Sequence, residues 1–142
     1  MGVFCLYQII YYLCGMEKEF IPMDLALRLK ALGFDEPCFG YRDGLGNLMI
    51  QKTPHCVISA PTFSQAFRFF REKYMIGHDI MCPFISYQGK NAEIISEGRY
   101  EVFLTDEEQL GITDEEFYSM TYNEAEIKCL NLLLRIVESK TE

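Results

Sequence analysis

Cysteine and histidine are the side chains here best suited to nucleophilic or metal chemistry, and the chain has six cysteines and two histidines. A cysteine nucleophile needs a base nearby, and Cys38 or Cys56 with His78 is the pairing to consider. Neither cysteine lies in a recognisable nucleophile turn or in an electropositive stretch that would favour the thiolate. A small enzyme with a Cys/His site, or a carboxylate site, is therefore an alternative hypothesis. Packing beneath the first helix is the favoured interpretation for Cys38.

A zinc site could be drawn from His55, Cys56, His78 and Cys82, because imidazole and thiolate are the ligands zinc prefers. Their spacing lacks the paired C-x-x-C or H-x-x-x-H arrangements that hold ligands at tetrahedral distances. We predict no metal site and no cofactor. Buried thiols and surface histidines are the favoured interpretation.

Phosphate, calcium and acid–base chemistry each have candidate residues in the sequence. Residues 43–47 (DGLGN) hold two glycines but no P-loop lysine, so they predict a hairpin turn. Residues 105–108 and 113–116 (both TDEE) match a helix capping box rather than an EF-hand, which alternates its acidic ligands around a central glycine. Asp35 and Glu36 are neighbours in the sequence and are expected to point apart, so no carboxylate pair is nominated.

A basic cluster of Arg68, Arg71 and Lys73 lies on the second predicted helix, with Glu72 among these residues. The chain as a whole carries 21 acidic and 13 basic residues, a net charge of −8 that repels a phosphate backbone at long range. A solvated helix face is therefore favoured over a nucleic-acid accessory surface, which remains a second alternative.

Three similar five-residue segments begin the predicted helices. Residues 22–26, 62–66 and 121–125 each begin with Pro or Thr and place an Ala four residues later, which suits a helix start that approaches a sheet closely. Helices are expected over residues 22–32, from residue 62 onward and over 122–139. Strands are expected over residues 38–41, 48–51, 56–59, 79–87, 92–96 and 100–104.

This order predicts the α+β class: a single domain with a mostly antiparallel sheet and about three helices packed on one face. The last helix is apolar over a wide arc, so we expect it to be covered from two sides. Its two apolar faces are Ala125, Cys129, Leu132, Leu133 and Ile136, and then Ile127, Leu130, Leu134 and Val137.

Residues 1–15 carry no charged side chain, although 24% of the chain is charged. The run is too short for a membrane span and lacks the basic segment of a secretory signal. We interpret residues 1–15 as an apolar N-terminal extension, with Met16 as a candidate true start, and residues 16–142 as the single α+β domain. The competing interpretation is an added strand or helix that covers the core. Cysteines without a regular spacing predict reduced thiols and a cytoplasmic location.

Three stretches resemble a group of small uncharacterised proteins of Bacteroidetes bacteriophages, prophages and mobile elements: residues 29–41 (LKALGFDEPCFGY), 65–74 (QAFRFFREKY) and 122–130 (YNEAEIKCL). The resemblance spans most of residues 17–138 and implies a cytoplasmic accessory protein with no established activity to carry over. The leading hypothesis is therefore a non-enzymatic protein-interaction module that binds a protein partner or itself.

Overall fold

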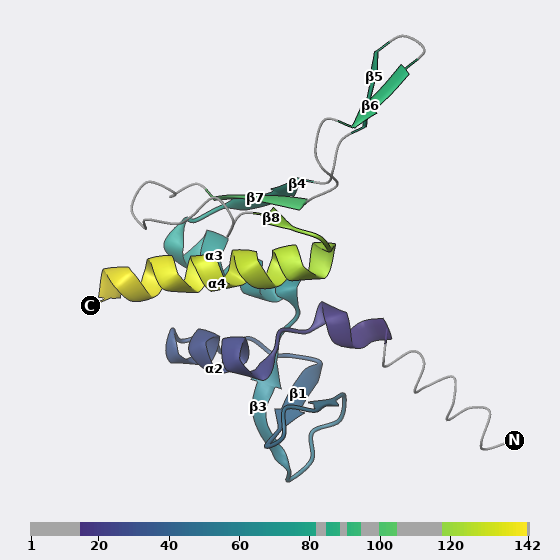
Figure 1. Cartoon of the computed structure of the whole chain (residues 1–142). Coiled ribbons are helices and arrows are strands. Elements are labelled where there is room, and N and C mark those ends of the chain that lie inside the picture. Colours follow the sequence, from purple (N-terminus) through teal and green to yellow (C-terminus); the bar gives the residue numbers. More distant parts are fainter. Residues whose placement is uncertain (1–14, 82–84, 89–90, 95–99, 105–117, 142) are drawn as a thin grey trace, which may run out of the picture. The chain divides into compact units, whose positions relative to one another are not determined.

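The computed structural model describes residues 15–81, 85–88, 91–94, 100–104 and 118–141. Contacts along the chain gather in two compact units, Met1–Ala66 and Phe67–Glu142. Figure 1 shows the elements of each unit. The N-terminal unit holds α2 and a three-stranded sheet, and the C-terminal unit holds α4 with a second three-stranded sheet.

Helix α2 (Met23–Ala31) forms where the sequence predicts it, and it contacts β3 of its own unit. Leu25, Ala26 and Leu29 are buried on one face, as the apolar spacing requires. The C-cap of the helix is Leu32, and the next residue, Gly33, has a φ of +89° that glycine adopts without a steric cost. The amide of Phe34 then donates to the Leu29 carbonyl at 3.2 Å, which closes a Schellman motif.

The N-terminal sheet is antiparallel, with the order β2-β1-β3. Its strands are β1 (Gly40–Asp43), β2 (Leu48–Met49) and β3 (Cys56–Ala60). The predicted hairpin turn joins β1 to β2, because Asp43 Oδ1 accepts the amides of Leu45 and Asn47, each at 2.9 Å. Gly46 takes a φ of +87° at the end of this turn.

Arg42 is the buried charge of this unit, with 4% of its surface exposed. Its Nη1 donates to Glu17 Oε1 at 3.0 Å and to the Gly46 carbonyl at 3.1 Å. Its Nη2 donates to the Ile21 carbonyl at 3.1 Å and to the Phe20 carbonyl at 3.5 Å. The guanidinium therefore joins the hairpin turn to the segment that begins with the 3-10 helix η1 (Glu17–Glu19).

Helix α3 (Phe63–Tyr74) contains the boundary between the two units. Thr62 begins it through a capping box, since Thr62 Oγ1 accepts the Gln65 amide at 3.3 Å and Gln65 Oε1 accepts the Thr62 amide at 3.1 Å. An aromatic stripe on one side of α3 is buried, and the charged residues expected on a solvated face are exposed. The buried residues are Phe63, Ala66, Phe67 and Phe70, and the exposed ones are Arg68, Arg71 and Glu72.

The C-terminal unit contains β4 (His78–Met81), β7 (Tyr100–Leu104) and β8 (Tyr118–Ser119), paired antiparallel in the order β4-β7-β8. Strands β5 (Ile85–Gln88) and β6 (Asn91–Ile94) form a separate antiparallel ladder. Helix α4 (Tyr122–Thr141) contacts β4, β7 and β8. Both predicted faces of α4 are buried apart from the half-buried Ile127.

The α+β class, the antiparallel pairing and the three predicted helices are confirmed. The alanine at the end of each repeated five-residue segment is buried, as expected. The exposed fractions are 2% for Ala26, 0% for Ala66 and 0% for Ala125. The strands of the described residues are divided among three sheets, and the expected strand 79–87 is represented by β4 and β5. Residues 1–14 and the acidic stretches at 105–108 and 113–116 lie outside the described residues.

Candidate functional site

One face of the N-terminal sheet, together with the residue before β1, carries apolar side chains that are exposed or half-buried. Tyr41 pairs with Met49 and with Ser59, so these three side chains share one face. Val57 and Ser59 are both exposed, on either side of the buried Ile58, and Val57 lies at the point where the β1–β3 register shifts. Phe39 lies just before β1. Phe39 is 80% exposed and Val57 is 55% exposed. We call Phe39, Tyr41, Met49, Val57 and Ser59 the outer face.

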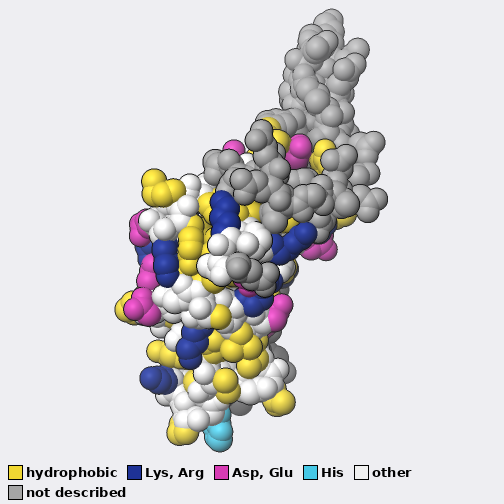
Figure 2. Space-filling model, turned by 90° about the vertical axis from the view of Figure 1, so that its left-hand side faces the viewer, with side chains coloured by type: hydrophobic (Ala, Val, Ile, Leu, Met, Phe, Trp, Pro, Cys, Tyr) yellow, Lys and Arg dark blue, Asp and Glu magenta, His cyan; other side chains and the backbone are white. Residues whose placement is uncertain are grey.

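The opposite face of this sheet is covered. Ile58 and Ala60 of β3 are 5% and 0% exposed, and α2 contacts β3. A half-covered antiparallel sheet normally presents polar side chains to water, and here the uncovered side carries an aromatic and aliphatic set instead. Figure 2 shows one side of the molecule, with exposed hydrophobic side chains between lysine, arginine and acidic ones.

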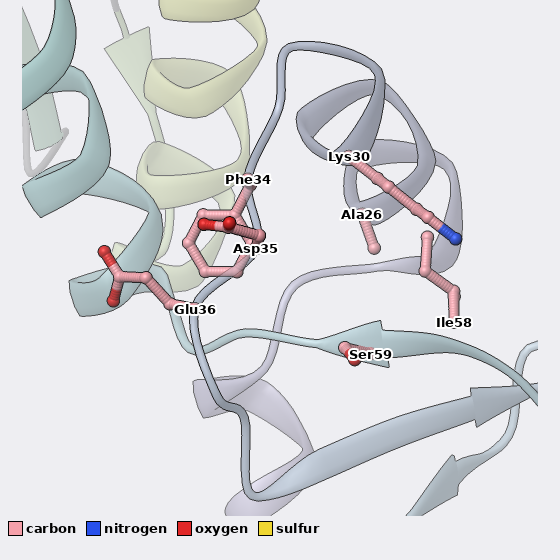
Figure 3. A pocket seen from close by; sticks show the side chains of 7 residues that line it. All are labelled: Ala26, Lys30, Phe34, Asp35, Glu36, Ile58 and Ser59. Atoms are coloured by element: carbon pink, nitrogen blue, oxygen red, sulfur yellow. The ribbon is translucent and has the colours of Figure 1, made fainter.

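A pocket of about 200 Å³ lies between α2, the loop that follows it and β3. We call it the edge pocket. Figure 3 shows the ammonium of Lys30 at one end and the carboxylate of Asp35 at the other, with the methyl group of Ala26 between them. Both charged residues are exposed. The pocket is smaller than the roughly 300–1,000 Å³ of a typical small-molecule site. Its lining residues are Ala26, Lys30, Phe34, Asp35, Glu36, Ile58 and Ser59.

Asp35 and Glu36 both line the edge pocket, but they point away from Lys30, and Glu36 extends away from Ile58 (Figure 3). The described carboxylates therefore form no convergent acid–base pair within this pocket.

The two cysteines proposed as nucleophiles form hydrogen bonds with groups other than histidine. The thiol of Cys38 donates to the Glu36 carbonyl at 3.3 Å, and burial, together with the Glu36 charge, raises the pKa of Cys38 to about 11. Cys56 Sγ accepts the Thr53 amide at 3.3 Å. A thiol with a raised pKa is a poor nucleophile near neutral pH. The pairing of Cys38 or Cys56 with His78 stays a prediction.

His78 lies in the C-terminal unit, where its ring stacks on Phe67 with 3.8 Å between centroids. Burial lowers the pKa of His78, the Arg71 charge lowers it further, and Asp79 acts in the opposite direction. Its Nδ1 is buried without a hydrogen-bond partner in the described structure. These features favour the neutral form of the imidazole, which lies against an aromatic ring.

Metal ligands do not gather in the part of the chain that the structure describes: no three His, Cys, Asp or Glu side chains there lie close enough to hold an ion. Of the four zinc candidates, His55, Cys56 and His78 are described, and Cys82 lies outside the described residues.

The basic residues proposed for nucleic acid are all exposed on α3. Lys73 Nζ lies 5.1 Å from the ring centroid of Phe69 and 5.5 Å from that of Tyr74. Its charge is therefore engaged with aromatic rings of its own helix. The nucleic-acid role of Arg68, Arg71 and Lys73 stays a prediction.

Comparisons of the chain with protein-family models, with curated proteins and with solved structures gave no match. No described helix has an apolar stretch long enough to cross a membrane.

The outer face and the edge pocket were not predicted from the sequence. All five residues of β3 (CVISA) are small or apolar, so alternation alone does not tell which of them face water. The sequence offered one signal of an exposed apolar surface, which was Phe39. This aromatic residue directly precedes Gly40, and no predicted helix offered an apolar residue to cover it.

Proposed function

We propose that this chain is a non-enzymatic protein-interaction module that binds through the outer face of its N-terminal sheet. The observation that carries the proposal is the exposure of Phe39 and Val57 beside Tyr41 and Met49, on the side of the sheet opposite α2. Its cellular setting, an accessory protein of a phage or mobile element in the cytoplasm, belongs to the same proposal and rests on the resemblance of residues 17–138.

The physical driving force is removal of this face from water. Burial of apolar surface contributes roughly 25 cal/mol per Å², and aromatic residues are enriched at the centres of protein interfaces. Phe39 and Tyr41 provide two rings close together, and Met49 is a flexible side chain that adapts to different partner shapes. The rigid strands hold the set in place, so little ordering is needed on binding.

Photo-crosslinking in the cell tests the proposal. A photoreactive phenylalanine analogue replaces Phe39 in the full chain, and a matched variant carries it at Met120, which is 68% exposed in the C-terminal unit. We expect a discrete protein adduct from position 39 and not from position 120, identified by mass spectrometry. Equal, diffuse labelling from both positions would remove the basis for the proposal.

A further inference from the structure

The turn that joins α3 to β4 consists of residues 75–77. Met75 has a φ of +59°, a left-handed conformation that is unfavourable for a residue with a Cβ. The Ile76 amide donates to the Phe70 carbonyl at 3.3 Å, and Ile76 is 4% exposed, so the chain bonds back to α3 before β4 begins. A backbone in a sparsely populated conformation persists only while its surroundings fix it. The contacts beside this turn therefore decide whether it stays closed.

His78, the first residue of β4, supplies one of these contacts. Its ring stacks on Phe67 of α3, with 3.8 Å between the ring centroids and 28° between the ring planes. Phe67 is 5% exposed, so one face of the imidazole lies against the core of the C-terminal unit. The Nδ1 atom of His78 is buried and has no hydrogen-bond partner in the described structure. The side chain that begins β4 thus contacts α3 through the face of its ring.

The protonation state of His78 decides how favourable this contact is. A neutral imidazole can place an unprotonated Nδ1 in the buried position, whereas an imidazolium carries a proton on both nitrogens. Nδ1 is then a buried donor without an acceptor, which is a costly arrangement. The face of a phenylalanine ring attracts a cation, but this attraction is smaller than the cost of leaving a buried charged donor unpaired. The contact therefore favours the neutral ring.

The surroundings of the ring act in the same direction. Burial lowers the pKa of His78 most, the positive charge of Arg71 on α3 lowers it further, and the attraction of Asp79 on β4 does not offset them. The neighbouring strand β7 places the uncharged Leu104 opposite His78. Helix α4 also contacts β4, and its buried side chains are apolar apart from the neutral thiol of Cys129, whose pKa burial raises.

We propose that protonation of His78 opens the junction between α3 and β4, which makes the C-terminal unit an acid-sensitive element of the fold. When the ring gains its proton it leaves Phe67 for water, and the turn at Met75 relaxes with it. The free energy that holds the junction closed is complete above the ordinary histidine pKa of 6.5 and decreases as the pH falls below it. This inference does not depend on the proposed interaction through the outer face.

Proton NMR of the imidazole rings tests the premise, because the chain has two histidines and His55 is exposed. His78→Phe keeps an aromatic ring at this position and assigns the two signals by removing one. We expect the His78 signal of the wild-type chain to titrate at a lower pH than the His55 signal in the same sample. A His78 midpoint at or above that of His55 would overturn the proposal.

Charge variants show whether the surroundings described above set this midpoint. We expect Arg71→Gln to raise the His78 midpoint and Asp79→Asn to lower it, since each removes one of the two charges that act on the ring. Arg68→Gln, at an exposed position of the same helix, is the matched control and should leave the midpoint unchanged. Equal effects of the two arginine variants would count against the assigned geometry.

Hydrogen exchange measured by mass spectrometry at pH 7.5 and pH 5.0 tests the opening itself. After correction for intrinsic exchange rates, we expect the protection of residues 67–81 to fall about tenfold at the lower pH in the wild-type chain and in His55→Gln. His78→Phe should abolish this fall, and residues 23–31 of the N-terminal unit serve as the internal reference. An equal loss of protection in His78→Phe would overturn the proposal. If this variant does not fold, His78→Gln gives the same comparison.

Discussion

At the scale of single residues, Cys38 shows how burial changes the chemistry of a side chain that the sequence offered as a nucleophile. Its thiol is half-buried and bonded to the Glu36 carbonyl. Burial, with the Glu36 charge, raises its pKa from the ordinary 9.0 to about 11. The folded chain thus holds this proton to higher pH than the unfolded chain does. Its contribution to stability is complete below pH 9 and is lost as the pH rises toward 11.

The reactivity of Cys38 is expected to follow this pKa. The measurement is the rate of alkylation by iodoacetamide, mapped to Cys38 by peptide mass spectrometry. We expect this rate to rise with a midpoint near pH 11 in the native protein and near pH 9 in urea. The native thiolate fraction at pH 8 is then about 100-fold smaller than in urea. Coincident pH profiles in the two conditions would contradict the burial argument, whereas slower but parallel labelling would reflect access alone.

At the scale of elements, Gly40 is required by a close approach. A Cβ at Gly40 would lie 2.8 Å from the Phe20 ring, and Phe20 is 4% exposed. We expect Gly40→Ala to lower the free energy of urea unfolding by about 1–3 kcal/mol, because the ring or the strand must move. Gly44→Ala is the matched control, since its Cβ would meet its nearest neighbour, Val57, at 3.9 Å. Equal losses in the two variants would show that glycine flexibility, not the contact, sets the effect.

The elements that the sequence predicts well are those with local signals. The Thr62 start of α3 and the 43–47 turn are each confirmed by hydrogen bonds within a few residues of the signal. Strand β8 was missed because its two residues, Tyr118 and Ser119, pair only with a distant strand. The outer face and the edge pocket were missed because the edge position of β3 depends on strand order, which is a long-range property.

At the scale of the whole molecule, the chain is organised as two units whose boundary falls inside α3. Nothing local marks this boundary, because the aromatic stripe of α3 is continuous across it. Fold class follows from the order of helices and strands, whereas the division of contacts into units follows from which strands pair.

The two units should open separately. Leu133 of α4 is 0% exposed, so Leu133→Ala should lower stability by about 3 kcal/mol. In hydrogen exchange measured by mass spectrometry, we expect faster exchange in α4, β4 and β7, with a smaller change in β1 and β3. Leu27→Ala, at a position 47% exposed, is the control and should change little. A uniform acceleration along the chain would indicate a single cooperative unit.

The guanidinium of Arg42 has a consequence for the stability of two segments. Its acceptors come from the 43–47 turn and from residues 17–21, which are separated by the whole of α2. Until both segments are present, desolvating this cation is unfavourable, since a buried charge requires its full set of partners. We therefore expect the 43–47 turn and residues 17–21 to depend on each other for stability, so that a change that displaces one of them also destabilises the other.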